Sequence, residues 1–190
     1  METKNYKKTE DKSTIRKKML NIRKNMTSED INSLSHLISD SVVDMAKEYK
    51  DRPICAYASI KNEADISFAI KKLLKDKRTV AMPRVFGDYM DFYIINSYED
   101  LEIGCFGIPE PKRTCKKLIP TNALVFLPGS AYSKDKKRIG YGKGYYDRFF
   151  EDKKDNILVG VGYSFQTGLD FICSEFDISM DFVINEKEIV

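Results

Sequence analysis

Short apolar segments alternate along the chain with segments of helical periodicity, and this alternation constrains the fold more than any other feature. The apolar segments have the length of strands and lie at residues 54–59, 79–82, 91–95, 123–127, 157–163 and 182–184. The helical segments lie at residues 12–25, 27–49 and 65–75, and another helix starts at Tyr145. Several strands are apolar throughout, so both faces of their sheet must be covered. We therefore predict an α/β fold, a three-layer sandwich with a mixed, mostly parallel sheet and helices on both faces.

The helix starts carry capping signals. Ser13 is a candidate N-cap of the first helix, and Thr27 or Ser28 of the second, which has acidic residues in its first turn. The segment 104–111, with two glycines and two prolines, is predicted to be a turn-rich loop.

The length of 190 residues suits a single domain, and no repeat or linker divides the chain. We predict a flexible basic arm at residues 1–11 and one α/β domain at residues 12–190. No apolar stretch approaches the roughly 20 residues that span a bilayer, and the polar N-terminus does not resemble a secretory signal. We expect a cytoplasmic monomer that binds neither membranes nor nucleic acid.

Charge is unevenly distributed, although the net charge is only +3. Residues 1–25 carry nine Lys or Arg against three acidic residues, and residues 134–148 carry six against two. Residues 149–190 carry three against nine. Two basic clusters in a nearly neutral chain indicate an anionic ligand between them. The single histidine, His36, lies in a polar helical stretch and is predicted to be a surface residue rather than a catalytic one.

The segment 128–148 combines glycines with positive charge between a buried strand and a helix. Gly140, Gly142 and Gly144 allow positive φ angles and close approach of a ligand to backbone N–H groups. Arg138 and Lys143 add full charges, and the helix start adds a partial one. The loop is neither a Gly-x-Gly-x-x-Gly loop nor a Walker A loop. It predicts a phosphate or nucleotide site, and the alternative is a flexible basic surface loop.

The same segment resembles the signature of the 5-formyltetrahydrofolate cyclo-ligase family, also called 5,10-methenyltetrahydrofolate synthetases. Residues 138–148 read Arg-Ile-Gly-Tyr-Gly-Lys-Gly-Tyr-Tyr-Asp-Arg. Further landmarks match in order over roughly residues 12–186: segments 12–16, 63–65, 82–84, 90–92 and 107–111, then Gln166 and Asp177. Three positions depart from the family pattern: Tyr132-Ser133 replaces Phe-Asp, Lys136-Lys137 replaces a glycine, and Phe176 replaces a polar residue before Asp177.

The resemblance implies ATP- and Mg²⁺-dependent cyclisation of 5-formyltetrahydrofolate, possibly polyglutamylated, to 5,10-methenyltetrahydrofolate. It places catalytic roles on Lys143, Arg138 and Arg148, and a Mg²⁺ site on Asp147 and Asp177. It places the folate near Ile60, Glu63, Asp65, Tyr145 and Tyr146. The ATP contacts that it implies are Lys12, Ser13, Thr14, Ile15, Arg16, Arg138, Ile139, Gly140, Tyr141, Gly142, Lys143, Gly144, Tyr145 and Tyr146.

Simpler roles compete with several of these assignments. Glu63 is also a candidate surface helix cap, Asp147 a favourable charge in a first helical turn, and the Tyr145–Tyr146 pair a piece of core packing. Two other functions stay open from the residues alone: a phosphate-binding enzyme of the sugar-phosphate isomerase type, and a nucleic-acid-binding module that uses the basic arm.

Overall fold

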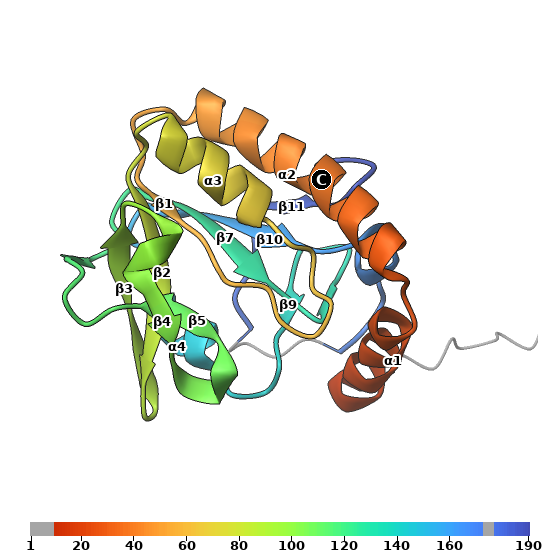
Figure 1. Ribbon diagram of the computed structural model, residues 1–190. Helices are drawn as coiled ribbons and strands as arrows, with labels where there is room; N and C mark the ends of the chain where they lie inside the picture. Colours follow the sequence, from red (N-terminus) through yellow and green to blue (C-terminus); the bar gives the residue numbers. More distant parts are fainter. Residues whose placement is uncertain (1–9, 173–176) are drawn as a thin grey trace, which may run out of the picture.

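The computed structural model describes residues 10–172 and 177–190, so most of the predicted basic arm and the substitution at Phe176 lie outside the described residues. Its centre is a seven-stranded sheet with the order β11-β10-β7-β1-β2-β3-β6 (Figure 1). The first five strands in this order are parallel, and the last two are antiparallel to their neighbours. The predicted mixed, mostly parallel sheet is confirmed. Its strands are β1 Ile54–Cys55, β2 Val80–Phe86, β3 Tyr89–Ile95, β6 Lys117–Leu118, β7 Leu124–Pro128, β10 Ile157–Val161 and β11 Phe182–Ile184.

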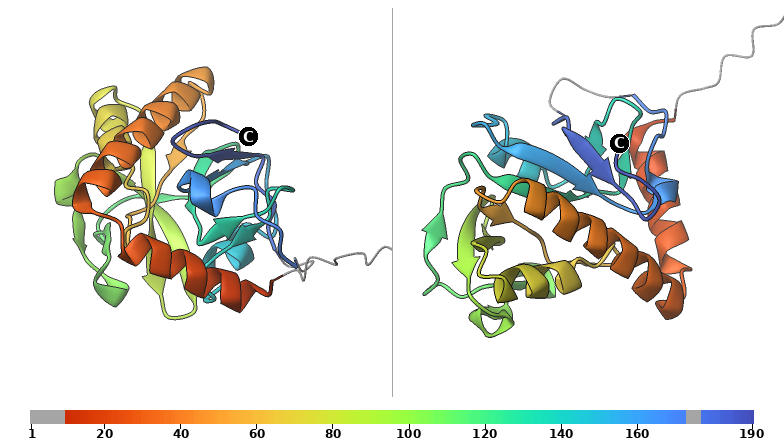
Figure 2. Two further views of the ribbon diagram at one scale, coloured as in Figure 1. Left: turned by 90° about the vertical axis from the view of Figure 1, so that its right-hand side faces the viewer. Right: turned by 90° about the horizontal axis from the view of Figure 1, so that it is seen from above.

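Two helices cover one face of the sheet, α2 (Ser28–Glu48) and α3 (Ser67–Lys75), which pack side by side (Figure 2). Thr27 caps α2 by accepting a hydrogen bond from the Asp30 N–H. Of the two predicted N-caps, Thr27 and Ser28, Thr27 is therefore the correct one. His36 is exposed on α2, which confirms its predicted surface position. No helix in the described part of the chain is long and apolar enough to cross a membrane.

The opposite face is covered by one short helix, α4 (Tyr145–Phe149), and by the hairpin of β8 (Ala131–Tyr132) and β9 (Arg138–Ile139). Phe149 and the following Phe150 pack their rings against Phe92 of β3 at centroid distances of 5.3 and 5.9 Å. The prediction of helices on both faces is therefore confirmed, although within the described residues the second helical layer is a single short helix.

The first helix, α1 (Lys12–Lys24), packs on the β8–β9 hairpin instead of on the central sheet. Ile15 and Met19 form its apolar stripe. The prediction of Ser13 as its cap is wrong. Asp11 is the N-cap, and its carboxylate accepts from the Ser13 and Thr14 N–H groups at 2.8 and 3.1 Å. An acidic cap suits this position because the first helical N–H groups have no partner within the helix.

Several strand boundaries differ from the prediction. β1 is only two residues long, because the chain leaves the sheet after Cys55 toward the loops at the carboxyl edge. The segment 104–111 is not wholly a loop, since β5 (Pro109–Pro111) pairs with β4 (Leu101–Ile103) in a separate hairpin. The two-residue strands β6, β8 and β9 were not predicted, because pairs of this length leave no alternation in the sequence.

Candidate active site

The two basic clusters of the sequence meet at the carboxyl edge of the sheet, where α/β folds place their ligand sites. Arg16 of α1 donates through Nε to the Gly140 carbonyl at 2.8 Å, across 124 residues of sequence. Arg23, in the last turn of α1, donates through Nη2 to the Tyr141 hydroxyl. Asn62, in the loop after β1, donates to the Arg23 carbonyl at 2.9 Å. These contacts join α1, the loop after β1 and the glycine loop, which we define as residues 138–144.

The glycine loop uses its glycines for two different purposes. Gly142 and Gly144 have φ angles of 93° and 67°, the left-handed region in which glycine carries no steric penalty. Gly140 has no positive φ, so the prediction for it is corrected. A Cβ at Gly140 would lie 2.9 Å from Arg138 Nη1, so glycine is there to make room. The α4 helix that follows has only five residues, and its dipole contributes less than a long helix would.

Arg138 is the buried cation of the glycine loop, with 3 % of its surface exposed. Its guanidinium donates to the Pro128 carbonyl at 3.0 Å and to Asp147 Oδ1 at 2.9 Å, and it lies over the Tyr146 ring. Lys143, by contrast, is exposed, and no side-chain hydrogen bond or ion pair to its ammonium is found within residues 10–172 and 177–190. One cation is thus fixed in the protein and the other is available to a ligand.

Arg148 and Tyr145 connect the glycine loop to the turn between β2 and β3. Arg148 donates to the Lys143 carbonyl at 2.8 Å and to the Asp88 carbonyl at 2.9 Å. The Tyr145 hydroxyl donates to the Gly87 carbonyl at 2.8 Å. The two side chains therefore hold the glycine loop against the β2–β3 hairpin.

Glu63 is buried, with 4 % of its surface exposed, so it is not a surface helix cap. Its Oε2 accepts from the Ile60 N–H at 2.9 Å, and its Oε1 lies 3.9 Å from Arg23 Nη1. Burial raises the pKa of the Glu63 carboxyl, while the Tyr141 hydroxyl, the Ile60 N–H and Arg23 oppose this rise. Burial also raises the pKa of the Tyr141 hydroxyl, so it remains protonated.

The other two residues expected beside the folate have local partners. Ile60 is half-buried, and its carbonyl accepts from the Glu63 N–H at 2.9 Å, which closes the turn that holds Glu63. Asp65 accepts from the Ser67 N–H and hydroxyl at 2.9 and 3.0 Å. Both carboxylate oxygens of Asp65 are thus occupied at the start of α3, which leaves Glu63 as the carboxylate of this loop with an oxygen to offer.

The residues of α1 that are expected to contact ATP differ in their exposure. Ser13 and Thr14 are exposed in the first turn, whereas the Ile15 side chain is buried against Ala131 and Ile139. Ile139 is itself part of that apolar cluster, so Ile15 and Ile139 position α1 against β9. Lys12 is half-buried and pairs with Asp177.

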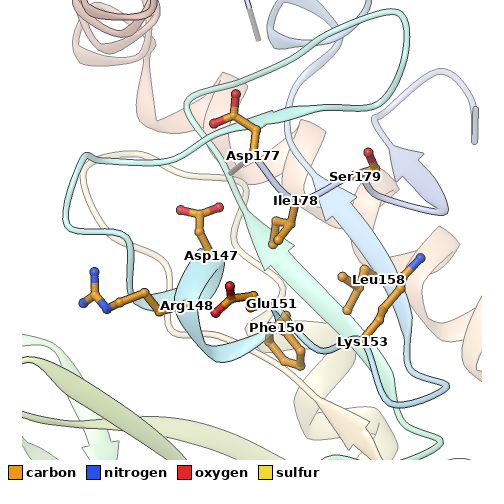
Figure 3. A pocket seen from close by; sticks show the side chains of 9 residues that line it. All are labelled: Asp147, Arg148, Phe150, Glu151, Lys153, Leu158, Asp177, Ile178 and Ser179. Carbon is orange, nitrogen blue, oxygen red and sulfur yellow. The ribbon is translucent and has the colours of Figure 1, made fainter. Parts of the chain in front are cut away.

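Asp147 and Asp177 line one cavity of about 420 Å³ (Figure 3). The other residues that line this cavity are Arg148, Phe150, Glu151, Lys153, Leu158, Ile178 and Ser179, of which Phe150, Leu158 and Ile178 are apolar. Asp147 pairs with Arg138, and Asp177 pairs with Lys12. Carboxylate oxygens are the ligands that Mg²⁺ prefers, and this cation typically uses only one or two of them beside phosphates and waters. The donor set therefore fits Mg²⁺, although no cluster of three metal-binding side chains occurs in the described part of the chain.

Two polar side chains fix the strand ends beneath the site. Tyr132, where the family pattern has Phe, is fully buried, and its hydroxyl accepts from the Val161 N–H at 3.0 Å and lies 2.8 Å from the Leu127 carbonyl. Gln166 donates to the Gly129 and Ser130 carbonyls at 3.0 and 2.9 Å. Both contacts hold the turn that follows β7.

Arg23 is the site residue that the sequence analysis missed. A signal was present, because Arg23 continues the four-residue spacing of the buried residues Ile15 and Met19 on α1. A cation on the apolar stripe of a helix is buried at a cost and therefore indicates a partner.

The fold and this site define an α/β enzyme with a glycine-rich, cationic site at the carboxyl edge of its sheet. The sequence profile of the 5-formyltetrahydrofolate cyclo-ligase family matches residues 8–186. The chain therefore belongs to the 5-formyltetrahydrofolate cyclo-ligase family of enzymes.

Individual relatives agree with this assignment. The chain is 29 % identical to a 5-formyltetrahydrofolate cyclo-ligase of Mycoplasma pneumoniae over 183 residues, which covers 93 % of this chain and 99 % of the relative. It is similar to the solved structure of Aquifex aeolicus 5,10-methenyltetrahydrofolate synthetase, with a TM-score of 0.83, 31 % identity, and coverage of 94 % and 91 % of the two chains. The solved structure of the 5,10-methenyltetrahydrofolate synthetase from Mycoplasma pneumoniae gives a TM-score of 0.77 at 25 % identity, over 94 % of this chain and 100 % of that one.

Proposed function

We propose that the chain converts 5-formyltetrahydrofolate to 5,10-methenyltetrahydrofolate with consumption of ATP. The observation that carries the proposal is the meeting of Arg16, the glycine loop and the buried carboxylate of Glu63 at one edge of the sheet. Cations and a glycine-rich loop suit a triphosphate, and a buried carboxylate suits the amino-pyrimidine edge of a pterin, which is rich in donors. Family membership supports the pairing of these two ligands.

The chemistry begins with a poor electrophile, because the formyl carbon is part of an amide. Transfer of the γ-phosphoryl group to the formyl oxygen breaks the bond to ADP and creates a good leaving group. N10 then attacks the formyl carbon, loses its proton, and expels inorganic phosphate as the five-membered ring closes. In phosphoryl transfer the protein mainly positions the reactants and supplies positive charge. The two reaction steps therefore need no histidine and no protein nucleophile.

The residues of the site divide this work according to their positions. The exposed ammonium of Lys143 lies beside the phosphates and stabilises the negative charge that develops on the γ-phosphoryl group during its transfer. Arg16 and Arg138 orient the loop and the triphosphate, and Arg148 holds the loop against the hairpin. Glu63 accepts from the pterin ring. Tyr146 and Tyr145 border the folate.

Asp147 and Asp177 are the residues that would hold Mg²⁺. When bound, this ion would neutralise part of the phosphate charge. The carboxylates would then exchange part of their present pairing with Arg138 and Lys12 for the ion.

We also propose the broader assignments that the sequence suggests. The protein is a cytoplasmic monomer with its functional domain at residues 12–190 and a flexible basic arm at residues 1–11, of which Asp11 caps α1. Its folate substrate includes polyglutamylated 5-formyltetrahydrofolate, and it binds neither nucleic acid nor membranes.

The proposal is tested by mixing the protein with 5-formyltetrahydrofolate, Mg²⁺ and ATP. We expect methenyl product, followed by its near-ultraviolet absorbance, in one-to-one ratio with ADP. Reactions without ATP, and reactions with a non-hydrolysable ATP analogue, should give none. If the complete mixture forms no ATP-dependent product, the proposed function is wrong.

A further inference from the structure

Arg23 is the most deeply buried charged side chain in the described part of the molecule, with 1 % of its surface exposed. Removing a guanidinium from water is costly and is tolerated only where the charge is compensated. Its ion-pair partner is Glu63, itself 4 % exposed, with 3.9 Å between Nη1 and Oε1. The two charges thus neutralise each other inside the protein, between the end of α1 and the loop after β1.

The Arg23–Glu63 ion pair leaves some of its hydrogen-bonding atoms without a partner among the described residues. Arg23 donates through Nη2 to the Tyr141 hydroxyl, and its guanidinium lies 5.5 Å from the centre of the Tyr141 ring. Arg23 Nε and Nη1, and Glu63 Oε1, have no hydrogen-bond partner within residues 10–172 and 177–190. Since the Ile60 N–H occupies Oε2, Oε1 is the acceptor that Glu63 still has to offer.

A purely structural arginine elsewhere in the chain looks different. Arg78 also fastens the end of a helix, but its guanidinium donates to the carbonyls of Ala46, Tyr49 and Arg52 at 2.5, 3.0 and 3.0 Å. Those bonds satisfy backbone groups and involve no acidic side chain. Arg23 directs its side-chain contacts to a carboxylate and a glycine-loop tyrosine instead, which is the arrangement expected of a residue that acts on the site.

We propose that Arg23 is a positioning residue for folate recognition: it keeps Glu63 as a carboxylate whose Oε1 accepts from the pterin ring, and it fixes that carboxylate relative to Tyr141 of the glycine loop. This inference rests on the proposed function. Burial raises the pKa of Glu63, and the Tyr141 hydroxyl, the Ile60 N–H and the charge of Arg23 oppose this rise. Arg23 contributes both its charge and, through its bond to the Tyr141 hydroxyl, the position of that hydroxyl. A protonated Glu63 would present a donor where the pterin edge also presents donors, and recognition would be lost.

The test is a double-mutant cycle of Arg23→Gln and Glu63→Gln, with KM for 5-formyltetrahydrofolate, KM for ATP and thermal midpoint measured for each protein. We expect each single variant to raise the folate KM by about tenfold or more, with a much smaller change in the ATP KM. The double variant should be no worse than Glu63→Gln alone, because Arg23 acts through Glu63. The matched control, Arg78→Gln, should lower the thermal midpoint and leave the folate KM unchanged.

Arg23→Lys and Tyr141→Phe keep the test decisive if Arg23→Gln does not fold. Arg23→Lys retains the charge and should recover part of the folate affinity. Tyr141→Phe removes the hydroxyl and should raise the folate KM only while Arg23 is present. Additive effects in the cycle, or equal changes in both KM values, would overturn the inference. A wild-type protein that forms no product would instead refute the proposed function, so the two failures are distinguishable.

Discussion

Lys143 differs from the other cations near the glycine loop in that its ammonium is exposed and makes no side-chain contact within the described residues. Arg138 and Arg148 are held by carbonyl groups, and Arg16 by Gly140. Because the Lys143 ammonium has no partner among the described residues, it is free to pair with negative charge on a bound substrate.

We expect Lys143→Ala to lower kcat about a hundredfold, because stabilisation of the transferring group is lost. The free energy of unfolding should change by less than about 0.5 kcal/mol, since the side chain is exposed. Lys143→Arg should recover only part of kcat, because a planar fork does not replace a compact ammonium. The control is Lys50→Ala, an exposed lysine at the opposite edge of the sheet. Full activity of Lys143→Ala would remove this residue from the site.

Glu63 predicts a pH dependence of folate binding. Its pKa is raised by burial, so the carboxylate is lost, as the pH falls, at a higher pH than for an ordinary glutamate. We expect the folate KM to rise in mildly acidic solution in the wild type and to stay flat in Glu63→Gln. Arg23 and Arg138 face Glu63, and so do the phenols of Tyr57, Tyr132, Tyr141 and Tyr146. Burial raises the pKa of each of these phenols, so none of them loses its proton in this range.

The sign for stability is opposite to that for binding. Because the folded-state pKa of Glu63 lies above its unfolded value, the folded protein binds the proton more readily, and this group adds stability as the pH falls. Loss of affinity in acid without a fall in the thermal midpoint would thus separate the two effects. A folate KM that tracks unfolding would contradict the prediction.

Among the secondary-structure elements, the parallel strands and long helices could be predicted from the sequence and the short hairpins could not. Val125 and Leu127 lie in a continuous apolar run, which is the pattern of a strand buried on both faces. β8 and β9 have two residues each, and their pairing depends on tertiary contacts. The same limit applies to the site: the glycine loop is a contiguous motif, whereas the Arg23–Glu63 pair joins residues 40 positions apart and depends on how α1 packs.

At the junction of β7 and β10, the Tyr132 hydroxyl provides the partner for the Val161 N–H. Pro128 lies opposite Val161 and has no N–H to donate. The Tyr132 hydroxyl also lies 3.0 Å from the Val161 carbonyl, so it closes the ladder at this residue. We expect Tyr132→Phe to lower the free energy of unfolding by about 1–3 kcal/mol, because it leaves a buried N–H unpaired. Denaturant unfolding measures this, with the half-buried Tyr93→Phe as the control. An unchanged unfolding free energy would show that the hydroxyl does not support this junction.

Helix α1 brings the N-terminal basic cluster to the site, and Arg16 is its contact with the glycine loop. We expect Arg16→Ala to raise the ATP KM by about tenfold, with little effect on the folate KM, because a charge-assisted contact near the phosphates is lost. Lys17→Ala, an exposed neighbour on the same helix, is the matched control. Steady-state kinetics with each substrate varied in turn makes the comparison. Equal behaviour of the two variants would mean that Arg16 is only a surface residue.

At the scale of the whole molecule, the site is assembled from chain segments that are distant in sequence and come from both ends of the domain. Lys12 of α1 pairs with Asp177 in the C-terminal segment, and Asp147 of α4 lines the same cavity as Asp177. A ligand bound here therefore connects three parts of the chain. Such a ligand stabilises the folded state as a whole by mass action.

This connection gives a prediction for Mg²⁺. We expect ADP to raise the thermal midpoint of the wild type, and Mg²⁺ to increase this rise. A ligand at a hundred times its Kd adds about 2.7 kcal/mol to the free energy of unfolding, which corresponds to several degrees in the thermal midpoint of a domain of this size. In Asp147→Asn and Asp177→Asn the Mg²⁺-dependent part of that rise should disappear, because an amide is a weaker ligand than a carboxylate. Comparing the midpoint with and without Mg²⁺ within each variant removes the cost of breaking the pairs with Arg138 and Lys12. Asp152→Asn, an exposed aspartate near α4, should keep the full increment, whereas an undiminished increment in both cavity variants would place the metal elsewhere.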